Sequence, residues 1–288
     1  MHWILDALGT AFFARALVGG ALVAIICGVV GTWVVIRGMA FLGEALGHGM
    51  LPGVAVATLA GAPPMLGGAV TAALMSALIG ALQRRGKLSY DTSIGLLFVA
   101  MLALGVIIVS HSGSFATDAT ALLFGDVLAI STADLLLLAI ATALTIAVAA
   151  AGHRAFVALA FDPRIAQALG HRVRLAGAAL TGLVTLAVVA SAQAVGTLLV
   201  VALLLGPAVA ATPWSRRIPD RMALAGVAGI AAVGLGLAVS WHAATAAGAT
   251  IAISAIALAG ASHLAHFIAT RPRPSRAPLT ASPLESHA

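Results

Sequence analysis

Long apolar segments alternate with short polar ones along most of the chain. Each apolar segment is close to the roughly 17–25 residues that a helix needs to cross the hydrocarbon core of a bilayer. Lipid offers the backbone no hydrogen-bond partners, so such segments must be helices. We therefore predict an all-α fold, a polytopic transmembrane bundle of nine spans, or eight if the short segment at 196–212 does not cross. The predicted spans are 14–36, 39–60, 64–82, 92–110, 133–151, 175–193, 196–212, 222–240 and 247–268.

Composition agrees with this pattern. The chain has 288 residues, of which 61% are hydrophobic and 8% charged. A soluble domain is about 45–50% apolar and about 25% charged, so too few charges are present here to build a soluble surface. We expect residues 1–269 to form the membrane domain. The Pro-rich polar stretch 270–288 is expected to be a disordered cytoplasmic tail.

The basic residues predict the orientation in the membrane. If the loop at 84–87 is cytoplasmic and the spans alternate, every Lys and Arg except Arg15 falls on the cytoplasmic side. This asymmetry is what the positive-inside rule predicts. It also explains the net charge of +6, and no basic helix or aromatic-basic module indicates a nucleic-acid partner.

The segment Arg37–Gly53 carries the most unusual pair of side chains. Glu44 and His48 lie four residues apart in an apolar stretch, which places them on one helix face. Ionisable groups inside a membrane are costly and face a cavity or a partner. A carboxylate and an imidazole together suit zinc or manganese. The pair is therefore either a transport site or a structural pair, and the residues alone leave both open.

A second segment, 161–171, has the signals of a short helix outside the membrane. Asp162 is a suitable N-cap, Pro163 fits the first helical position, and Gly170 can end the helix. It is either an ordinary loop helix or a docking element for a cytoplasmic partner. A third segment, 195–211, is by itself only an apolar helix containing a proline.

Together, and in this order, the three segments resemble the permease family of bacterial zinc, manganese and iron ABC importers. That family shows an Arg followed by Gly-Asp-x-x-x-His-x-x-x-Pro-Gly, then Asp-x-x-x-Ala-x-x-x-Gly, then Gly-x-Leu-Leu-x-x-Ala-Leu-Leu-x-x-Pro-Ala. The resemblance covers nearly the whole chain. One departure is Glu44, which stands where the family usually has Asp and reaches one methylene further.

The resemblance implies an ABC importer permease fold, with no permanently bound cofactor. Zinc, or else manganese or iron, would be the transported substrate, held transiently by Glu44 and His48. The permease would form a homodimer in the bacterial inner membrane and receive metal from an extracytoplasmic binding protein. A separate cytoplasmic ATPase would dock through coupling residues of the 161–171 helix. These coupling residues are Asp162, Pro163, Ala166 and Gly170.

The chain is not expected to be an enzyme. Gly80–Lys87 only partly matches a phosphate-binding loop, because Leu88 stands where Ser or Thr is needed. His111, Asp118 and Asp126 form a possible metal entrance on the outer side, or simply belong to the interface. The competing function is a proton-coupled secondary carrier that uses Glu44 and His48 as a relay.

Overall fold

The computed structural model describes residues 11–84, 88–112, 125, 127–168, 170 and 172–270, and these residues contain helices but no β-strand. Within them, nine helical segments are long and apolar enough to cross a membrane, which confirms the predicted bundle. The segments are α2 (Ala11–Ile36), α3 with α4 (Ala40–Gly49 and Leu51–Leu59), α5 (Pro64–Arg84), α6 (Tyr90–Ser112), α8 (Thr132–Phe161), α10 (Val173–Val195), α11 with η2 (Thr197–Ala211 and Thr212–Trp214), α12 (Ile218–Ala243) and α13 (Ala247–Ala269).

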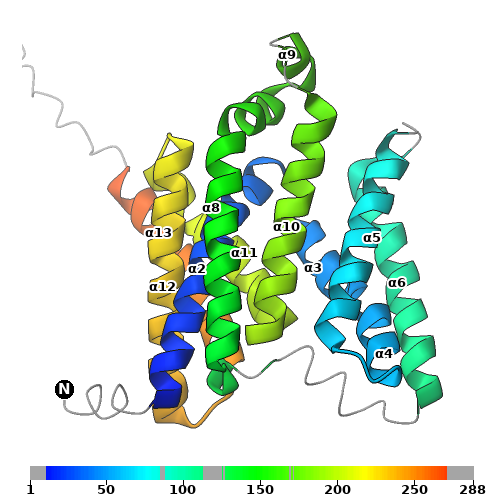
Figure 1. Ribbon diagram of the computed structural model, residues 1–288. Helices are drawn as coiled ribbons and strands as arrows, with labels where there is room; N and C mark the ends of the chain where they lie inside the picture. Colours follow the sequence, from blue (N-terminus) through cyan, green and yellow to red (C-terminus); the bar gives the residue numbers. More distant parts are fainter. Residues whose placement is uncertain are drawn as a thin grey trace, which may run out of the picture.

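The spanning helices form two groups (Figure 1). In one group, α2 packs against α8, α11 and α12, and α13 packs against α11 and α12. In the other, α4 packs against α5 and α6. The helices α3 and α10 lie between the groups, since α10 contacts both α8 and α5, and α3 contacts both α11 and α6. The Glu44–His48 segment therefore lies where the groups meet.

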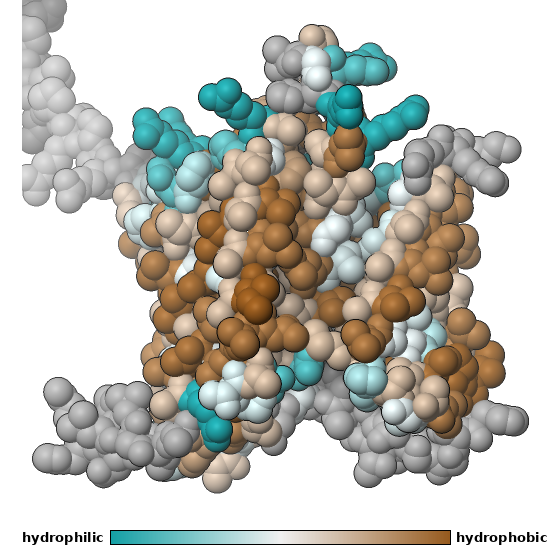
Figure 2. Space-filling view, viewed as in Figure 1, coloured by the Kyte–Doolittle hydropathy of each residue, from teal (hydrophilic) through white to brown (hydrophobic). Residues whose placement is uncertain are grey.

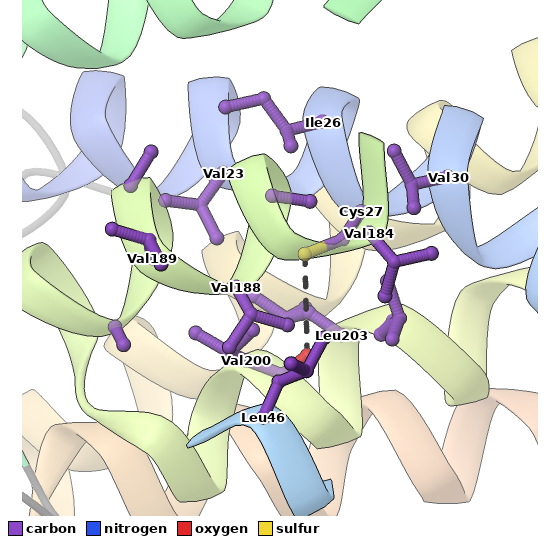
Figure 3. Packing of buried hydrophobic residues seen from close by; sticks show 14 of the residues in the cluster. Val23, Ile26, Cys27, Val30, Leu46, Val184, Val188, Val189, Val200 and Leu203 are labelled. Carbon is purple, nitrogen blue, oxygen red and sulfur yellow. Dashed lines mark hydrogen bonds between the residues drawn. The ribbon is translucent and has the colours of Figure 1, made fainter. Parts of the chain in front are cut away.

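Buried aliphatic side chains of α2, α3, α10 and α11 pack against one another (Figure 3). Cys27 is fully buried here, and its thiol lies 3.9 Å from the Val200 carbonyl oxygen. Buried aliphatic side chains such as these make many dispersion contacts, and these contacts drive helix association in lipid. The surrounding side chains are Val23, Ile26 and Val30 of α2, Leu46 of α3, Val184, Val188 and Val189 of α10, and Leu203 of α11.

Residue Gly196 makes the short connection between α10 and α11. Its φ of +80° lies in a region that residues with a Cβ rarely adopt. The turn is buried, and α11 starts at the next residue, Thr197. The short span at 196–212, whose crossing the sequence left open, is thus a helix that η2 extends to Trp214.

Two features differ from the simplest interpretation of the sequence. The helix α8 continues to Phe161, about ten residues beyond the predicted span end at 151, and is long enough to leave the hydrocarbon before it ends. Trp33 lies near a predicted span end, where tryptophans usually anchor at the interface. It is instead fully buried against the rings of His153 and Phe156.

The surface has the polarity of a membrane protein. Figure 2 shows a broad hydrophobic band, with hydrophilic residues concentrated at the end of the bundle where α9 (Pro163–Ala168) projects. The described arginines at this end include Arg154, Arg172, Arg174 and Arg217. Of the tail expected at 270–288, only Thr270 lies within the described residues.

Candidate functional site

The helix α3 positions the two candidate ligands. It begins after Gly38, whose φ of +64° allows the chain to reverse between α2 and α3. Leu42 and Leu46 are completely buried and fix the helix against the core. Glu44 is exposed and His48 is half-buried. The apolar face of α3 thus faces the bundle, and the carboxylate lies where a further molecule can reach it.

Glycines bring α3 unusually close to its neighbours. A Cβ built at Gly47 would lie 3.2 Å from the Cβ of Thr197 at the start of α11. A Cβ at Gly43 would lie 2.7 Å from a methyl group of Leu204. Small residues allow this kind of close approach between membrane helices. They hold the ligand-bearing helix directly against α11.

The surroundings of His48 are aromatic. Its ring meets Phe98 of α6 edge to face, with centroids 5.6 Å apart, and Phe98 contacts Phe41 in the same way at 5.4 Å. Among the described interactions, no hydrogen bond or ion pair joins Glu44 to His48.

Within the part of the chain that the structure describes, the pair does not form a closed metal site. Among the described residues, no third His, Cys, Asp or Glu joins them in a group that could hold a metal ion. Carboxylate oxygen and imidazole nitrogen are suitable ligands for manganese, iron and zinc. The arrangement therefore offers two protein ligands and leaves other coordination positions open.

The spanning segment is divided directly after His48. The helix α3 ends at Gly49 and α4 starts at Leu51, with Pro52 in its first turn. Pro52 has no N–H, so the His48 carbonyl lacks the donor that a regular helix would supply four residues later. The Met50 amide is directed at the Leu46 and His48 carbonyls, and the Met50 carbonyl accepts the Val54 amide at 3.0 Å, so helical bonding resumes directly after the division.

The predicted extramembrane helix is present as α9. The Arg164 amide donates to the Asp162 carboxylate at 2.7 Å, which caps the helix as expected. Ala166 of α9 is buried. Gly170 follows the helix with a φ of +77°. Pro163 is the first residue of α9. The local structure of this element is confirmed, and its role is taken up below.

One candidate beside α9 was not found from the sequence. Phe161, the last residue of α8, is 81% exposed at the end of the bundle where α9 projects. Hydropathy alone does not single out Phe161, because this residue only extends an apolar helix. The length of α8, 30 residues against the roughly 20 that cross the hydrocarbon, predicts that this ring lies outside the membrane, beside the cap residue Asp162.

The possible metal entrance is only partly within the described structure. His111 is in the last turn of α6, and Asp118 and Asp126 lie outside the described residues. Asp134, on the same side, is engaged locally. It forms a capping box with Ser131, whose amide and hydroxyl donate to its carboxylate at 3.0 and 2.6 Å.

A bundle of nine apolar spans with an ionisable pair in an internal helix defines a multi-pass integral membrane protein. Comparison with known proteins gives the family. The model of the ABC 3 transport family matches residues 10–265. The chain is 34% identical to the manganese transport system membrane protein MntC of Halalkalibacterium halodurans, over 87% of this chain and 86% of the relative.

Two further proteins extend this likeness. A probable iron transport system membrane protein of Haemophilus influenzae is 30% identical over 83% of this chain and 88% of the relative. A chain in the solved structure of PsaBC from Streptococcus pneumoniae in complex with Fab superposes with a TM-score of 0.79 at 30% identity, covering 90% of this chain and 93% of that one. The present chain belongs to the ABC 3 transport family and is a multi-pass protein of the bacterial plasma membrane.

Proposed function

We propose that this chain is the permease subunit of an ATP-driven importer for a divalent transition metal. The observation that carries the proposal is the Glu44–His48 pair on α3, an exposed carboxylate and a half-buried imidazole in a membrane-spanning segment. Family membership supplies the transport context, and the named relatives are manganese and iron transport proteins.

The metal would be held transiently at this pair. The His48 carbonyl, which loses its helical donor at Pro52 and is approached by the Met50 cap amide, would supply a third ligand from the same helix. The exposed position of Glu44 also leaves room for a second copy of the chain, related by a two-fold axis, to contribute its own ligands. An incomplete site suits transport, because the ion must leave as readily as it enters.

Manganese or iron is the proposed cargo. The sequence favoured zinc, and the ligand types suit all three metals. The names of the relatives favour manganese and iron. Zinc forms stronger complexes with such ligands, so it is kept as a competitor in every assay.

The helix α9 is the proposed docking element for a separate ATPase. It follows α8, a continuous helix of 30 residues that begins on the opposite side of the bundle. The Arg37 guanidinium, in the turn between α2 and α3, donates to the Leu159 carbonyl of α8 at 3.0 Å. This bond connects the cytoplasmic end of α8 to the helix that bears Glu44 and His48.

Metal uptake into vesicles tests the transport site. The vesicles contain the permease, its ATPase and an extracytoplasmic binding protein. We expect Glu44→Gln and His48→Ala each to reduce uptake of manganese or iron by about 100-fold, since mutating even the outer-shell partners of metal ligands typically costs 10–100-fold in affinity. Glu44→Asp keeps the carboxylate and should remain active.

Matched controls separate the site from general damage. His263→Ala removes an imidazole from α13, and Asp220→Asn neutralises a carboxylate in the first turn of α12. Both should transport normally. Normal uptake by both Glu44→Gln and His48→Ala would show that the pair is structural. Uptake that needs a proton gradient and no ATPase would instead support the secondary carrier.

The coupling role of α9 has its own test. Deleting 163–169 should leave the bundle inserted, because α9 lies outside the packed spans. ATP hydrolysis by the assembled complex should then no longer drive metal uptake, and Phe161→Ala should weaken ATPase binding. Uptake at the wild-type rate by the deletion variant would contradict the docking role.

A further inference from the structure

A cavity of about 610 Å³ lies apart from the Glu44–His48 pair, and neither of these residues lines it. Its walls come from the turn between α2 and α3 and from α5, α6, α8 and α10. Its polar lining includes Arg37, Gln83, Tyr90 and Arg174. These four residues come from four different segments of the chain, so the fold brings them together.

The cavity lies at the end of the bundle that bears α9. Arg37 follows the last turn of α2, Gln83 is in the last turn of α5, and Arg174 is in the first turn of α10. Figure 2 shows weakly polar residues in the hollow between α10 and α5, below the hydrophilic rim. By the orientation that the basic residues predict, this is the level of the cytoplasmic leaflet.

The lining is positively charged and rich in donors. It contains two arginines and, among the lining residues, no Asp or Glu. Arg37 uses one nitrogen for the Leu159 carbonyl, and burial lowers the pKa of its guanidinium from the ordinary value. The Tyr90 hydroxyl is buried beside Thr181 without a hydrogen bond of regular geometry. An anion here would restore solvation that the guanidinium has lost and accept from the hydroxyl.

The deeper walls are mainly apolar, and their hydroxyls are engaged within the protein: Ser76 and Thr185 hydrogen-bond to each other, and Thr181 donates to the Gly177 carbonyl. Ile79 of α5 and Leu180 of α10 are buried beside the cavity. Gly182 faces open space, since a Cβ built there would meet no atom within 4 Å. A positive mouth above an apolar wall matches an amphipathic anion better than a small hydrated one. The same charge disfavours a divalent cation, so the cavity does not fit the release path of the metal.

We propose that this cavity binds the phosphate head group of an anionic phospholipid from the cytoplasmic leaflet. Arg37 and Arg174 would hold the phosphate, and the apolar wall would accept the start of an acyl chain. Basic pockets between spanning helices on the cytoplasmic side are suited to anionic head groups. The lipid would contact Met39, which precedes α3, and the ends of α8 and α10 that flank α9. It would therefore connect the ligand-bearing helix to the coupling helix.

Native mass spectrometry of the purified full-length chain, titrated with dioleoylphosphatidylglycerol, tests the proposal. We expect one tightly retained lipid in the wild type. Arg174→Gln should weaken its retention about fivefold, the contribution of one basic residue near an anionic surface. Gly182→Leu, which fills open space, should abolish it. Arg37 is kept intact because its bond to Leu159 has a structural role.

Two controls match these variants. Arg172→Gln removes the same charge two residues away, outside the lining, and Gly234→Leu adds the same side chain at an open position of α12. Both should retain the lipid like the wild type. Wild-type retention by Arg174→Gln and Gly182→Leu would overturn the proposal. So would equal binding of dioleoylphosphatidylcholine to the wild type.

A further measurement on the wild-type chain distinguishes a phospholipid head group from free inorganic phosphate as the ligand of the cavity. We expect phosphatidylglycerol to raise the melting temperature of the wild-type chain. Inorganic phosphate at matched ionic strength should neither raise the melting temperature nor displace the lipid. If it does both, the cavity binds a soluble anion and the lipid assignment is wrong. This measurement decides the question even if a variant does not fold.

Discussion

The first two spans show how differently neighbouring segments of one membrane protein are built. The helix α2 is continuous over Ala11–Ile36 and contributes a row of fully buried aliphatic residues to the core. The next span is divided at Met50 into α3 and α4 and carries an exposed glutamate and a half-buried histidine. Only a three-residue turn, Arg37–Met39, separates the two.

The difference shows where a membrane protein can accommodate polar groups. Both spans are mostly enclosed by protein, and an enclosed helix can be interrupted, whereas a lipid-facing helix must satisfy every backbone group internally. The divided span lies between the two groups of helices, and the Thr71 hydroxyl of α5 lies 3.3 Å from the Met50 carbonyl oxygen at the division. The continuous span supplies rigidity, and the divided one supplies the chemistry.

The largest expected effect is on the continuous span. A side chain at Gly31 would overlap the backbone carbonyl of Leu204 in α11. Because backbone cannot rotate away as a side chain can, Gly31→Leu should lower the free energy of unfolding by about 3 kcal/mol or more. Thermal unfolding of the purified chain measures this. Gly234→Leu, at an open position, should melt near the wild type, and equal melting of both variants would contradict the packing argument.

An intermediate effect is expected at the contact between the two regions. Gly47→Ala places a methyl group 3.2 Å from the Cβ of Thr197, so α3 must shift by a few tenths of an ångström. The chain should still fold, and metal uptake should fall about tenfold because His48, the next residue, is misplaced. Gly234→Ala is the control for added helix propensity. A folded Gly47→Ala variant with full uptake would show that the site tolerates this movement.

The smallest effect concerns the division itself. Pro52→Ala restores an N–H that can bond to the His48 carbonyl. We expect unchanged or slightly higher thermal stability and uptake that is about threefold lower, because one neutral hydrogen bond competes for the oxygen. Faster uptake in this variant would indicate that the carbonyl does not take part in metal binding.

Much of this architecture could be predicted from the sequence. Spans follow from runs of apolar residues, and the ends of α9 follow from Asp162, Pro163 and Gly170, whose preferences are local. The placement of Glu44 and His48 on one helix face follows from helical periodicity alone. Such features need no knowledge of what lies opposite them.

Features that depend on tertiary contact could not be predicted in this way. The burial of Trp33 requires knowing that α8 lies against α2. The cavity near Arg37 requires the convergence of α5, α8 and α10. The exposure of Phe161 depends on how far α8 extends beyond the bilayer. For Trp33 and the cavity, the decisive neighbours are distant in sequence.

The position of Cys27 has a practical consequence for experiments. It is the chain's single cysteine, and it is completely enclosed between α2 and α11. A thiol reagent therefore has no accessible native target while the bundle is intact. A cysteine introduced at any exposed position can carry a probe without prior removal of the native one. Under denaturing conditions the same thiol becomes a reporter, since its labelling rate follows the opening of the core.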